Sequence, residues 1–232
     1  MTDIEEQAIC LRGDEVRAIL RGILMQTQVV GSLIIRPVKP NLFYGAPDWD
    51  RAWIDGPPED QYIHVSQSGG KYGEPTIQRV WPPFGPPATT MWCKEKWAVE
   101  SSLDTVQPKD IFHWPVWFDA DNEYYSNSPK FGFDTKSPRG KWRSPTHMPR
   151  WASRLDWMVG SNKVLRVQQL RFDQCLRAGI DGSCSTCGAT AGQIIERFKT
   201  HWNLLYKQPG LRYSDNPYVF LSEIADRQHL VM

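Results

Sequence analysis

The sequence predicts an α+β fold, built as a small, mostly antiparallel β-barrel with flanking helices and long loop insertions. Helix signals lie near the two ends of the chain and strand signals fill its middle, without the regular alternation that a parallel α/β sheet requires. The 18 prolines concentrate in 37–87 and 129–149, which favours long ordered loops over further helices there. We expect a single domain over residues 1–232, because this length suits one domain with insertions.

The first third of the chain is predicted to begin with a helix. Residues 14–22 carry Asp14 as a plausible N-cap, followed by apolar residues at helical spacing: Val16, Ile19, Leu20 and Ile23. A strand-rich stretch follows over 27–37. Residues from about 38 to 82 have little periodicity and much Pro, Gly and aromatic content. We interpret them as an insertion with short strands of its own, because a structureless loop of that length is unusual in a compact domain.

The middle of the chain is predicted to consist mostly of strands. Residues 89–100 alternate in the period of two typical of a strand, with Met91, Cys93 and Glu95 on one face and Trp92, Lys94 and Lys96 on the other. This alternation predicts that Glu95 and the two lysines cannot serve one site together. A further strand is expected over 114–118, and two strands over 154–170 around a turn at 160–162.

The last third is predicted to contain a short helix, a variable loop, a long helix and a closing strand. The short helix covers 172–180 and the variable loop about 181–189. The helix at 190–206 has the clearest signal, because Thr190 and Gln193 have the spacing of a capping box and an apolar face follows. The closing strand is expected over 216–225.

Composition limits the functions to consider. The chain has 27 Lys and Arg against 26 Asp and Glu, so nucleic-acid affinity would have to come from local clustering of charge. The 11 tryptophans suit either a core or base stacking, and most are expected in the core. The N-terminus does not read as a signal peptide, and no stretch approaches the length of a membrane span. These features predict a cytoplasmic protein with no membrane partner.

The five cysteines are expected to be free thiols, as suits a reducing compartment. Cys184 and Cys187 form a Cys-x-x-Cys pair, and Cys175 and His201 could complete a zinc site with them. Structural zinc sites normally show two such pairs, so a loop with two free thiols is the preferred interpretation. The sequence predicts no metal and no cofactor, and "QSGGKYG" lacks the spacing of a phosphate-binding loop.

The stretch "KWRSPTHMPRWASR" at 141–154 concentrates basic and aromatic side chains. It could bind phosphates and stack on bases through Arg143, His147, Arg150, Trp151 and Arg154. A structural alternative is that Met148 and Trp151 enter the core while the arginines bond to loop carbonyls or carboxylates. The preceding residues add a second basic and aromatic cluster, which suits either nucleic-acid binding or a solvated loop: Lys130, Lys136, Arg139, Lys141, Phe131, Phe133 and Trp142.

Five blocks of sequence, in order, carry a resemblance to a known family. They are "VRAILRGILMQTQVV" (16–30), "PFGPPATTMWCKEKWA" (83–98), "WRSPTHMPRWASRL" (142–155), "VLRVQQL" (164–170) and "FKTHWNLLYKQPGLRYSDNPYVFLSEI" (198–224). With them the chain resembles the ASCH-domain proteins of the PUA-like superfamily, especially the larger ones of bacteriophages and prophages. "HMPRWASR" is the most specific match. The stretches 38–82 and 181–189 fall outside it.

The resemblance implies a barrel cleft that holds RNA or a modified base. A small bacterial ASCH protein hydrolyses N4-acetylcytidine. The resemblance to that protein implies a lysine and a threonine in a "GRKTxT" turn and a glutamate from elsewhere in the barrel. Thr27 occupies the nucleophile position here, but Leu24 replaces the lysine and Met25 the next threonine. Glu95 matches the family's glutamate and Lys94 replaces an arginine. Leucine cannot activate a threonine hydroxyl, so the motif is damaged.

The sequence therefore predicts a phage-encoded module that binds nucleic acid (RNA or DNA) or a modified nucleoside in a PUA-like cleft. The expected cleft residues are Thr27, Trp92, Glu95, His147, Arg150 and Trp151, with Lys94, Arg143 and Arg154 contributing charge. A second hypothesis is an amidohydrolase acting on N4-acylated cytosine, with Thr27 as nucleophile and Glu95 assisting. A third is a phage inhibitor of a host defence protein, with the insertion at 38–82 as the interface.

Overall fold

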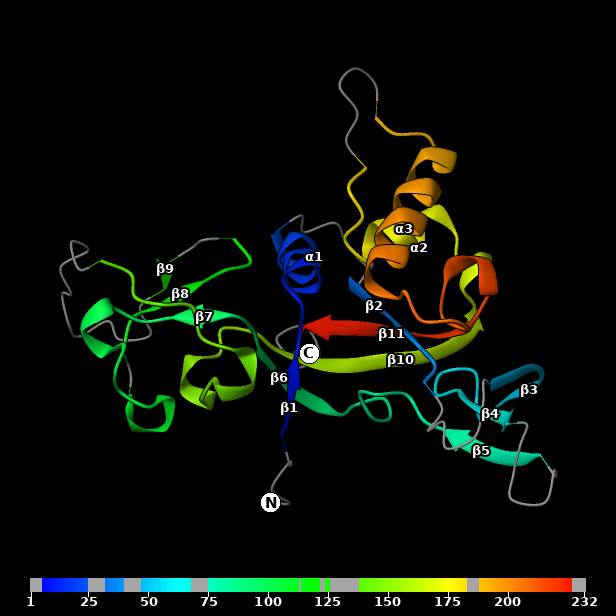
Figure 1. Cartoon of the computed structure of the whole chain (residues 1–232), viewed down its shortest axis with the longest axis horizontal. Coiled ribbons are helices and arrows are strands. Elements are labelled where there is room, and N and C mark those ends of the chain that lie inside the picture. Colours follow the sequence, from blue (N-terminus) through cyan, green and yellow to red (C-terminus); the bar gives the residue numbers. More distant parts are fainter. Residues whose placement is uncertain are drawn as a thin grey trace.

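The computed structural model describes residues 6–24, 32–39, 47–67, 75–112, 114–121, 124–125, 138–182 and 188–226. The fold is mixed α+β, as the sequence predicts, with one five-stranded sheet and two three-stranded sheets (Figure 1). The described strands form separate sheets, and no closed barrel is found among them. The barrel that the sequence predicts is therefore not confirmed.

The five-stranded sheet is the centre of the molecule. Its order is β1-β6-β10-β11-β2, with β1 parallel to β6 and all other neighbours antiparallel. The strands are β1 (Gln7–Cys10), β2 (Ser32–Pro37), β6 (Thr90–Lys94), β10 (Asp156–Arg166) and β11 (Tyr218–Asp226). In β6 the predicted alternation holds, because Met91 and Cys93 are buried while Trp92 and Lys94 are partly exposed. Trp157 of β10 is also buried, and the first core cluster forms around it.

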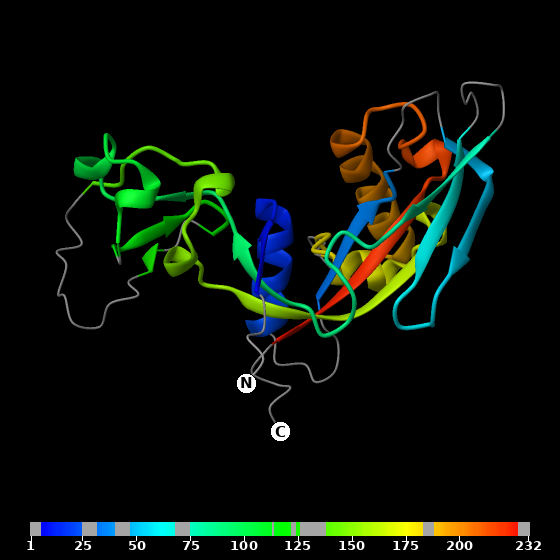
Figure 2. The ribbon, with the colours of Figure 1, turned by 90° about the horizontal axis from the view of Figure 1, so that it is seen from below.

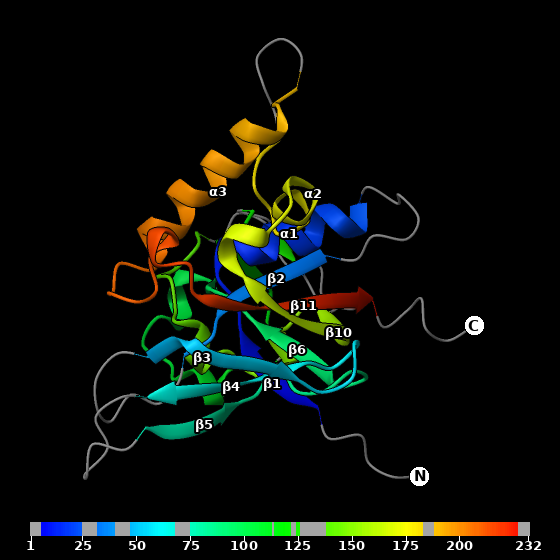
Figure 3. The same ribbon diagram turned by 90° about the vertical axis from the view of Figure 1, so that its right-hand side faces the viewer.

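Three α-helices lie on one side of this sheet (Figure 3): α1 (Gly13–Leu24), α2 (Phe172–Arg177) and α3 (Ala191–Leu205). Each helix occurs where the apolar spacing predicts it. α3 has the predicted capping box, in which the Thr190 hydroxyl accepts from the Gln193 N–H and the Gln193 side chain accepts from the Thr190 N–H. α1 begins at Gly13, one residue before the predicted start. The side chains of α2 and α3 pack with β2 and β11 in a second core cluster that contains Leu33, Phe198 and Trp202.

The described residues between 38 and 82 contain strands of their own, as predicted, and these strands form an antiparallel sheet, the insertion sheet, in the order β3-β4-β5. Its strands are β3 (Pro47–Asp55), β4 (Tyr62–Gln67) and β5 (Thr76–Val80). Figure 3 shows this sheet on the side of the central sheet away from the helices. Ile63 and Val65 point inward and pack on Val164 and Phe220 of the central sheet, which forms a fourth core cluster.

The described residues between 95 and 154 form a separate lobe, which Figure 2 shows beside α1 and away from the insertion sheet. The lobe contains β7 (Trp97–Ala98), β8 (Val116–Phe118) and β9 (Tyr124–Tyr125), with several 3-10 turns, among them Pro145–His147 and Arg150–Ala152. It has its own core: Trp97, Val99, Ile111, Val116, Phe118, Met148 and Ala152. The chain enters the lobe from β6 and leaves it into β10, and these two strands are antiparallel neighbours.

One predicted turn is wrong. Residues 154–170 were expected to form two strands around 160–162, but β10 runs without interruption from Asp156 to Arg166. The register against β11 shifts between Val159 and Ser161, so the strand contains a bulge where the sequence suggests a turn. Gly160 occupies the irregular position. A glycine inside a strand pattern is as typical of a bulge as of a turn.

No helix in the described part of the chain is both long and apolar enough to cross a membrane. This agrees with the absence of such a stretch from the sequence.

Asn162, next to the bulge, connects three segments from inside the core. Its Nδ2 donates to Asp60 Oδ1 (3.1 Å) and to the Gly85 carbonyl (2.9 Å), and its Oδ1 accepts from the Ser222 hydroxyl (2.7 Å). Its backbone N–H also donates to the Glu59 carbonyl at 2.7 Å. Asn162 thereby attaches the insertion and the loop after it to the central sheet.

Asn162→Ala should lower the free energy of unfolding by about 3 kcal/mol, because several buried polar groups lose their partners and each costs ~1–3 kcal/mol. Urea denaturation followed by circular dichroism measures the change. Asn203→Ala is the matched control: Asn203 is exposed, its Oδ1 accepts one bond from the Tyr213 N–H, and its loss should cost about 1 kcal/mol or less. Equal costs for the two variants would contradict the anchoring role of Asn162.

Candidate functional site

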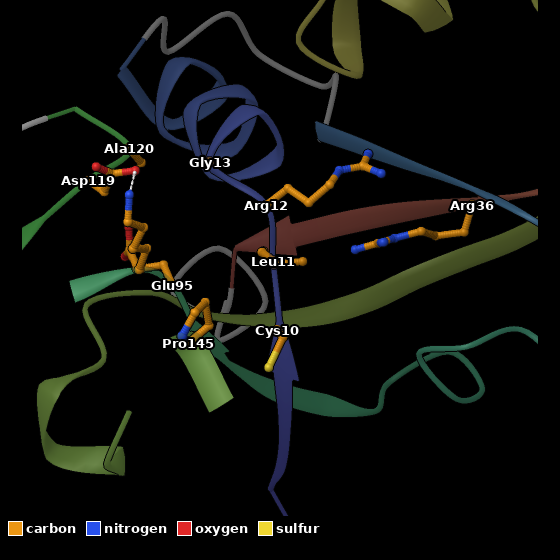
Figure 4. A pocket seen from close by; sticks show the side chains of 10 residues that line it. Cys10, Leu11, Arg12, Gly13, Arg36, Glu95, Asp119, Ala120 and Pro145 are labelled. Carbon is orange, nitrogen blue, oxygen red and sulfur yellow. Dashed lines mark ion pairs between the residues drawn. The ribbon is translucent and has the colours of Figure 1, made fainter. Parts of the chain in front are cut away.

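A cavity of about 360 Å³ lies between the lobe and the start of α1 (Figure 4). One wall comes from the β1–α1 connection and β2, and the other from the lobe. Its lining residues are Cys10, Leu11, Arg12, Gly13, Arg36, Glu95, Lys96, Asp119, Ala120 and Pro145. Charged groups of both signs therefore face one half-open space at the junction between the lobe and the rest of the chain.

On the first wall, Arg12 and Arg36 share the carboxylate of Glu15. Arg36 Nη2 lies 2.7 Å from Glu15 Oε2 and Arg12 Nη2 lies 3.0 Å from Oε1, while the Arg12 backbone N–H donates to Oε2 at 2.8 Å. Burial raises the pKa of Glu15, against the opposing attraction of both guanidinium groups. With Glu15 ionised, two positive charges meet one negative charge within this group, and Asp14, which also pairs with Arg12 but does not line the cavity, partly offsets the excess.

Arg12 is held in place by further contacts, whereas Arg36 extends toward the cavity. Arg12 Nη1 donates to the Tyr206 hydroxyl at 2.9 Å, and its Nε lies 3.3 Å from Asp14 Oδ1. Figure 4 shows the Arg36 side chain reaching from β2 toward Leu11. Arg36 is therefore the guanidinium group of this wall that is better placed to meet a ligand.

On the lobe wall, Glu95 forms a bidentate ion pair with Arg154. Arg154 Nε and Nη2 donate to the two Glu95 oxygens at 2.9 and 3.0 Å, and the same guanidinium group also bonds Asp121 at 2.6 and 3.1 Å. Glu95 is 2% exposed. Burial raises the pKa of Glu95, while the bonds from Arg154 oppose that rise. Arg154 also lies 4.0 Å from the Phe118 ring centroid, so lobe packing fixes its position.

Lys96 lines the cavity together with Glu95, which corrects the expectation that strand alternation separates them. β6 ends at Lys94 and β7 begins at Trp97, so strand alternation does not set the directions of the two residues between them. Lys96 Nζ lies 3.2 Å from Asp119 Oδ2 and 5.3 Å from the Trp142 ring centroid. Arg139 lies over the same ring at 4.1 Å. Lys96 thus connects the cavity to a tryptophan flanked by two cations.

Three of the predicted binding residues gather outside the cavity, around Trp92. Lys94 Nζ and Arg150 lie 5.1 and 5.6 Å from the Trp92 ring centroid, and Lys94 also donates to the Thr146 carbonyl. Arg150 pairs with two carboxylates, Glu6 at 3.0 Å and Asp156 at 2.7 Å. These ion pairs are exposed, so solvent weakens them and a phosphate could compete for the guanidinium group.

The other predicted site residues of the 141–154 stretch lie in different environments. Arg143 is buried and donates to the carbonyls of Leu103 and Val106, as the structural alternative requires. Trp151 is partly buried against the core of the lobe, whereas His147 is exposed at the end of a 3-10 turn. None of these three side chains lines the cavity, and of the eight predicted site residues that the structure describes only Glu95 does.

Several predictions fall on residues outside the described part of the chain. These are Met25, Thr27, Lys130, Phe131, Phe133, Lys136, Cys184 and Cys187. The helix α1 includes Leu24, but the side chain of Leu24 is not described. Of the proposed zinc ligands that are described, Cys175 is buried, which raises the pKa of its thiol to about 12, and His201 Nε2 lies 2.9 Å from Asp14. Among the described residues no group of three or more metal-ligating side chains occurs.

The residues of the first wall were missed by sequence reasoning. Arg12 and Glu15 belong to the sequence "RGDE" at the start of a predicted helix, which reads as an ordinary charged first turn. Arg36 follows a run of apolar strand residues and precedes Pro37. A charged residue on an otherwise buried strand is a signal for a paired or functional group, but its partner 21 positions away cannot be identified from spacing.

Comparisons with protein-family models, with curated proteins and with solved structures find no match for this chain. The resemblance to ASCH-domain proteins therefore stays a prediction, and the argument for function depends on the cavity and its surroundings.

Arg154→Met should lower the free energy of unfolding at pH 7 by about 3–5 kcal/mol, because it leaves buried Glu95 without its partner. Nothing then opposes burial, so the folded-state pKa of Glu95 rises further above its unfolded value. The ionised carboxylate costs the fold stability above that pKa, and protonation below it removes the cost. The deficit should therefore shrink on acidification.

Denaturation curves at several pH values test this expectation. Arg154→Met/Glu95→Gln should recover part of the loss, since the uncompensated charge is gone. Arg150→Met is the matched control, because exposed Arg150 also pairs with two carboxylates and should cost less than about 1 kcal/mol. A deficit that does not change with pH would contradict the role assigned to Glu95.

Proposed function

We propose that the protein binds a nucleotide, free or within an RNA or DNA strand, in the cavity between the lobe and α1. The single observation that carries this proposal is the lining of the cavity. Arg36 and Lys96 supply cationic groups from opposite walls, Glu95 supplies a buried carboxylate, and Lys96 leads to Trp142. A volume of about 360 Å³ is within the ~300–1,000 Å³ range of small-ligand pockets and suits one nucleotide.

The phosphate group fits between Arg36 on the first wall and Lys96 on the lobe wall. Arginine and lysine are the usual phosphate ligands, and the excess positive charge of the Arg12–Glu15–Arg36 group favours an anion. Lys96 is half exposed, and its partner Asp119 is also accessible, so a phosphate can replace that ion pair at little cost. α1 begins at Gly13 in the cavity wall, and its N-terminus adds to the positive potential.

The base fits between Glu95 and Trp142. A carboxylate has about four acceptor positions, and Arg154 occupies two of those on Glu95. The remaining positions can accept from an exocyclic amino group such as that of cytosine, adenine or guanine. Trp142 offers a stacking surface, and base–aromatic stacking contributes ~1–3 kcal/mol. The exposed groups around Trp92 extend the basic surface for a longer strand.

The sequence resemblance supports the same ligand class. ASCH-domain proteins of the PUA-like superfamily hold RNA or modified bases, and we propose membership of that family, a related barrel and a phage origin together with the binding function. Leu24 in place of the expected lysine supports a binding module over an efficient enzyme.

Lys96→Ala and Trp142→Ala should each weaken binding of fluorescein-labelled 12-nucleotide RNA or DNA by about tenfold, which corresponds to ~1.4 kcal/mol. Lys96→Ala should also reduce the slope of log K against log salt by about one. Fluorescence anisotropy at 50 and 200 mM salt, with cytidine monophosphate as competitor, measures both effects.

The matched control is Lys199→Ala on α3. Lys199 is 45% exposed and lies 3.3 Å from its carboxylate partner, against 47% and 3.2 Å for Lys96. It should leave binding unchanged. Absence of binding to RNA, DNA and free nucleotides at low salt, or equal effects of the two lysine variants, would remove the proposal.

A second candidate function is hydrolysis of N4-acylated cytosine, and the position of Glu95 favours it. Glu95 lines the cavity and burial raises its pKa, which moves a carboxyl group toward the range useful for proton transfer near neutral pH. In this candidate Thr27 is the nucleophile, as the resemblance implies.

Incubation with N4-acetylcytidine decides between the two functions. The hydrolase predicts release of cytidine and acetate, abolished by Thr27→Ala and by Glu95→Gln in protein that circular dichroism shows to be folded. Chromatographic detection of cytidine is the measurement. Nucleotide binding without any cytidine release would exclude the hydrolase and leave the binding function in place.

A further inference from the structure

The outward face of the insertion sheet carries a continuous set of aromatic side chains. Side chains alternate along a strand, and Ile63 and Val65 of β4 point into the core, so Tyr62 and His64 point outward. Cross-strand pairing puts Trp53 and Arg79 on either side of His64. We call this set the aromatic face: Trp53, Asp55, Tyr62, His64, Ile77, Arg79 and Trp81.

Ring contacts hold the aromatic face in one arrangement. Trp53 stacks on His64 with centroids 4.7 Å apart and planes 14° apart, and Tyr62 lies 4.3 Å from Trp81. The Arg79 guanidinium group lies 5.1 Å from the Tyr62 ring and 5.5 Å from the Trp81 ring. Side chains already ordered by their neighbours lose little conformational entropy on binding.

The rings nevertheless remain open to solvent. Trp53 is 45%, Trp81 53% and Ile77 58% exposed. These three are among the nine large apolar side chains that the described residues expose. Clusters of this kind mark interaction surfaces more often than single exposed residues do, and tryptophan and tyrosine are frequent anchors of protein interfaces.

The charges around these rings disfavour binding of a nucleic acid to the aromatic face. The described residues of the sheet and its turns carry two guanidinium groups, Arg51 and Arg79, against five carboxylates: Asp48, Asp50, Asp55, Glu59 and Asp60. Asp55 on the face itself accepts from the Gly56 N–H at 2.8 Å and the Tyr62 hydroxyl at 3.0 Å. These bonds lower the pKa of Asp55 and keep it ionised. A phosphate backbone would be repelled.

We propose that the aromatic face is the docking surface for a protein partner that presents a basic segment with interspersed apolar side chains. Lysine or arginine side chains of the partner would lie over the Trp53 ring and pair with Asp55, while apolar side chains would cover Ile77 and Trp81. A second copy of this chain is disfavoured as the occupant, because a symmetric contact would oppose two carboxylate-rich surfaces. The proposal is independent of nucleotide binding in the cavity, since the two sites share no residue.

A phage-displayed library of random 12-residue peptides, selected on the full chain, tests the proposal. Counter-selection uses Trp53→Ser/Trp81→Ser, two exposed positions whose replacement should leave the fold intact by circular dichroism. The enriched peptides are expected to carry net positive charge. In fluorescence polarisation, the labelled peptide should lose at least tenfold in affinity with Trp81→Ser and with Asp55→Lys, and should bind less tightly at high salt.

Two controls separate this face from other surfaces. Phe112→Ser replaces an aromatic residue of the lobe that is 70% exposed, and it should leave peptide affinity unchanged. Lys96→Ala should also leave peptide affinity unchanged. Loss of nucleotide binding and loss of peptide binding are therefore caused by different variants and can be distinguished.

Four outcomes would overturn the proposal. In the first, the enriched peptides bind through the aromatic face but carry negative or no net charge. In the second, no enriched peptide depends on the aromatic face for binding. The third is dimerisation of the chain in analytical ultracentrifugation that Trp53→Ser/Trp81→Ser abolishes. The fourth is binding of a labelled dT12 or U12 strand that the same double variant abolishes.

Discussion

The ion pair between Glu95 and Arg154 is the contact on which the position of the lobe depends. These two residues are where the chain enters and leaves the lobe, so their bidentate bond closes the lobe at its base. The same bond puts the Glu95 carboxylate into the cavity wall, and Arg154 reaches on to Asp121 within the lobe. Because a buried charge without a partner is costly, neither residue can change alone. Lobe position and cavity chemistry therefore share this interaction, and Arg17 of α1 adds a second contact with the lobe, because its Nη1 donates to the Ala120 carbonyl at 3.0 Å.

The opposite wall of the cavity is also built from ion pairs, but there the guanidinium groups outnumber the carboxylate that they share. On the lobe side, one guanidinium group serves two carboxylates, Glu95 and Asp121, whereas on the other side two guanidinium groups serve Glu15. The cavity consequently lies between an acceptor-rich wall and a donor-rich wall. A ligand with a phosphate at one end and an amino-bearing base at the other matches this polarity. An anion or a base alone would satisfy only half of it.

The sequence predicted the local elements better than the site, for physical reasons. Helical periodicity and the Thr190 capping box identified α3, because both signals depend on residues a few positions apart. Alternation identified β6 only as far as Lys94, where the strand ends and Glu95 and Lys96 turn to the same cavity. The basic composition around Arg143 could not reveal that backbone carbonyls already use its charge. Long-range partners of this kind follow from the fold and not from spacing.

The partly buried Trp142 and the exposed Trp53 have opposite electrostatic surroundings, although the sequence alone shows only two tryptophans. Trp142 lies between Lys96 and Arg139, so a base stacked on it would have cations near its phosphate. Trp53 lies on a sheet where carboxylates outnumber cations, so a cationic side chain is favoured over its ring. An indole attracts bases, cations and apolar groups alike. The neighbouring charges decide which of these each surface favours, and they distinguish the proposed nucleotide site from the proposed docking face.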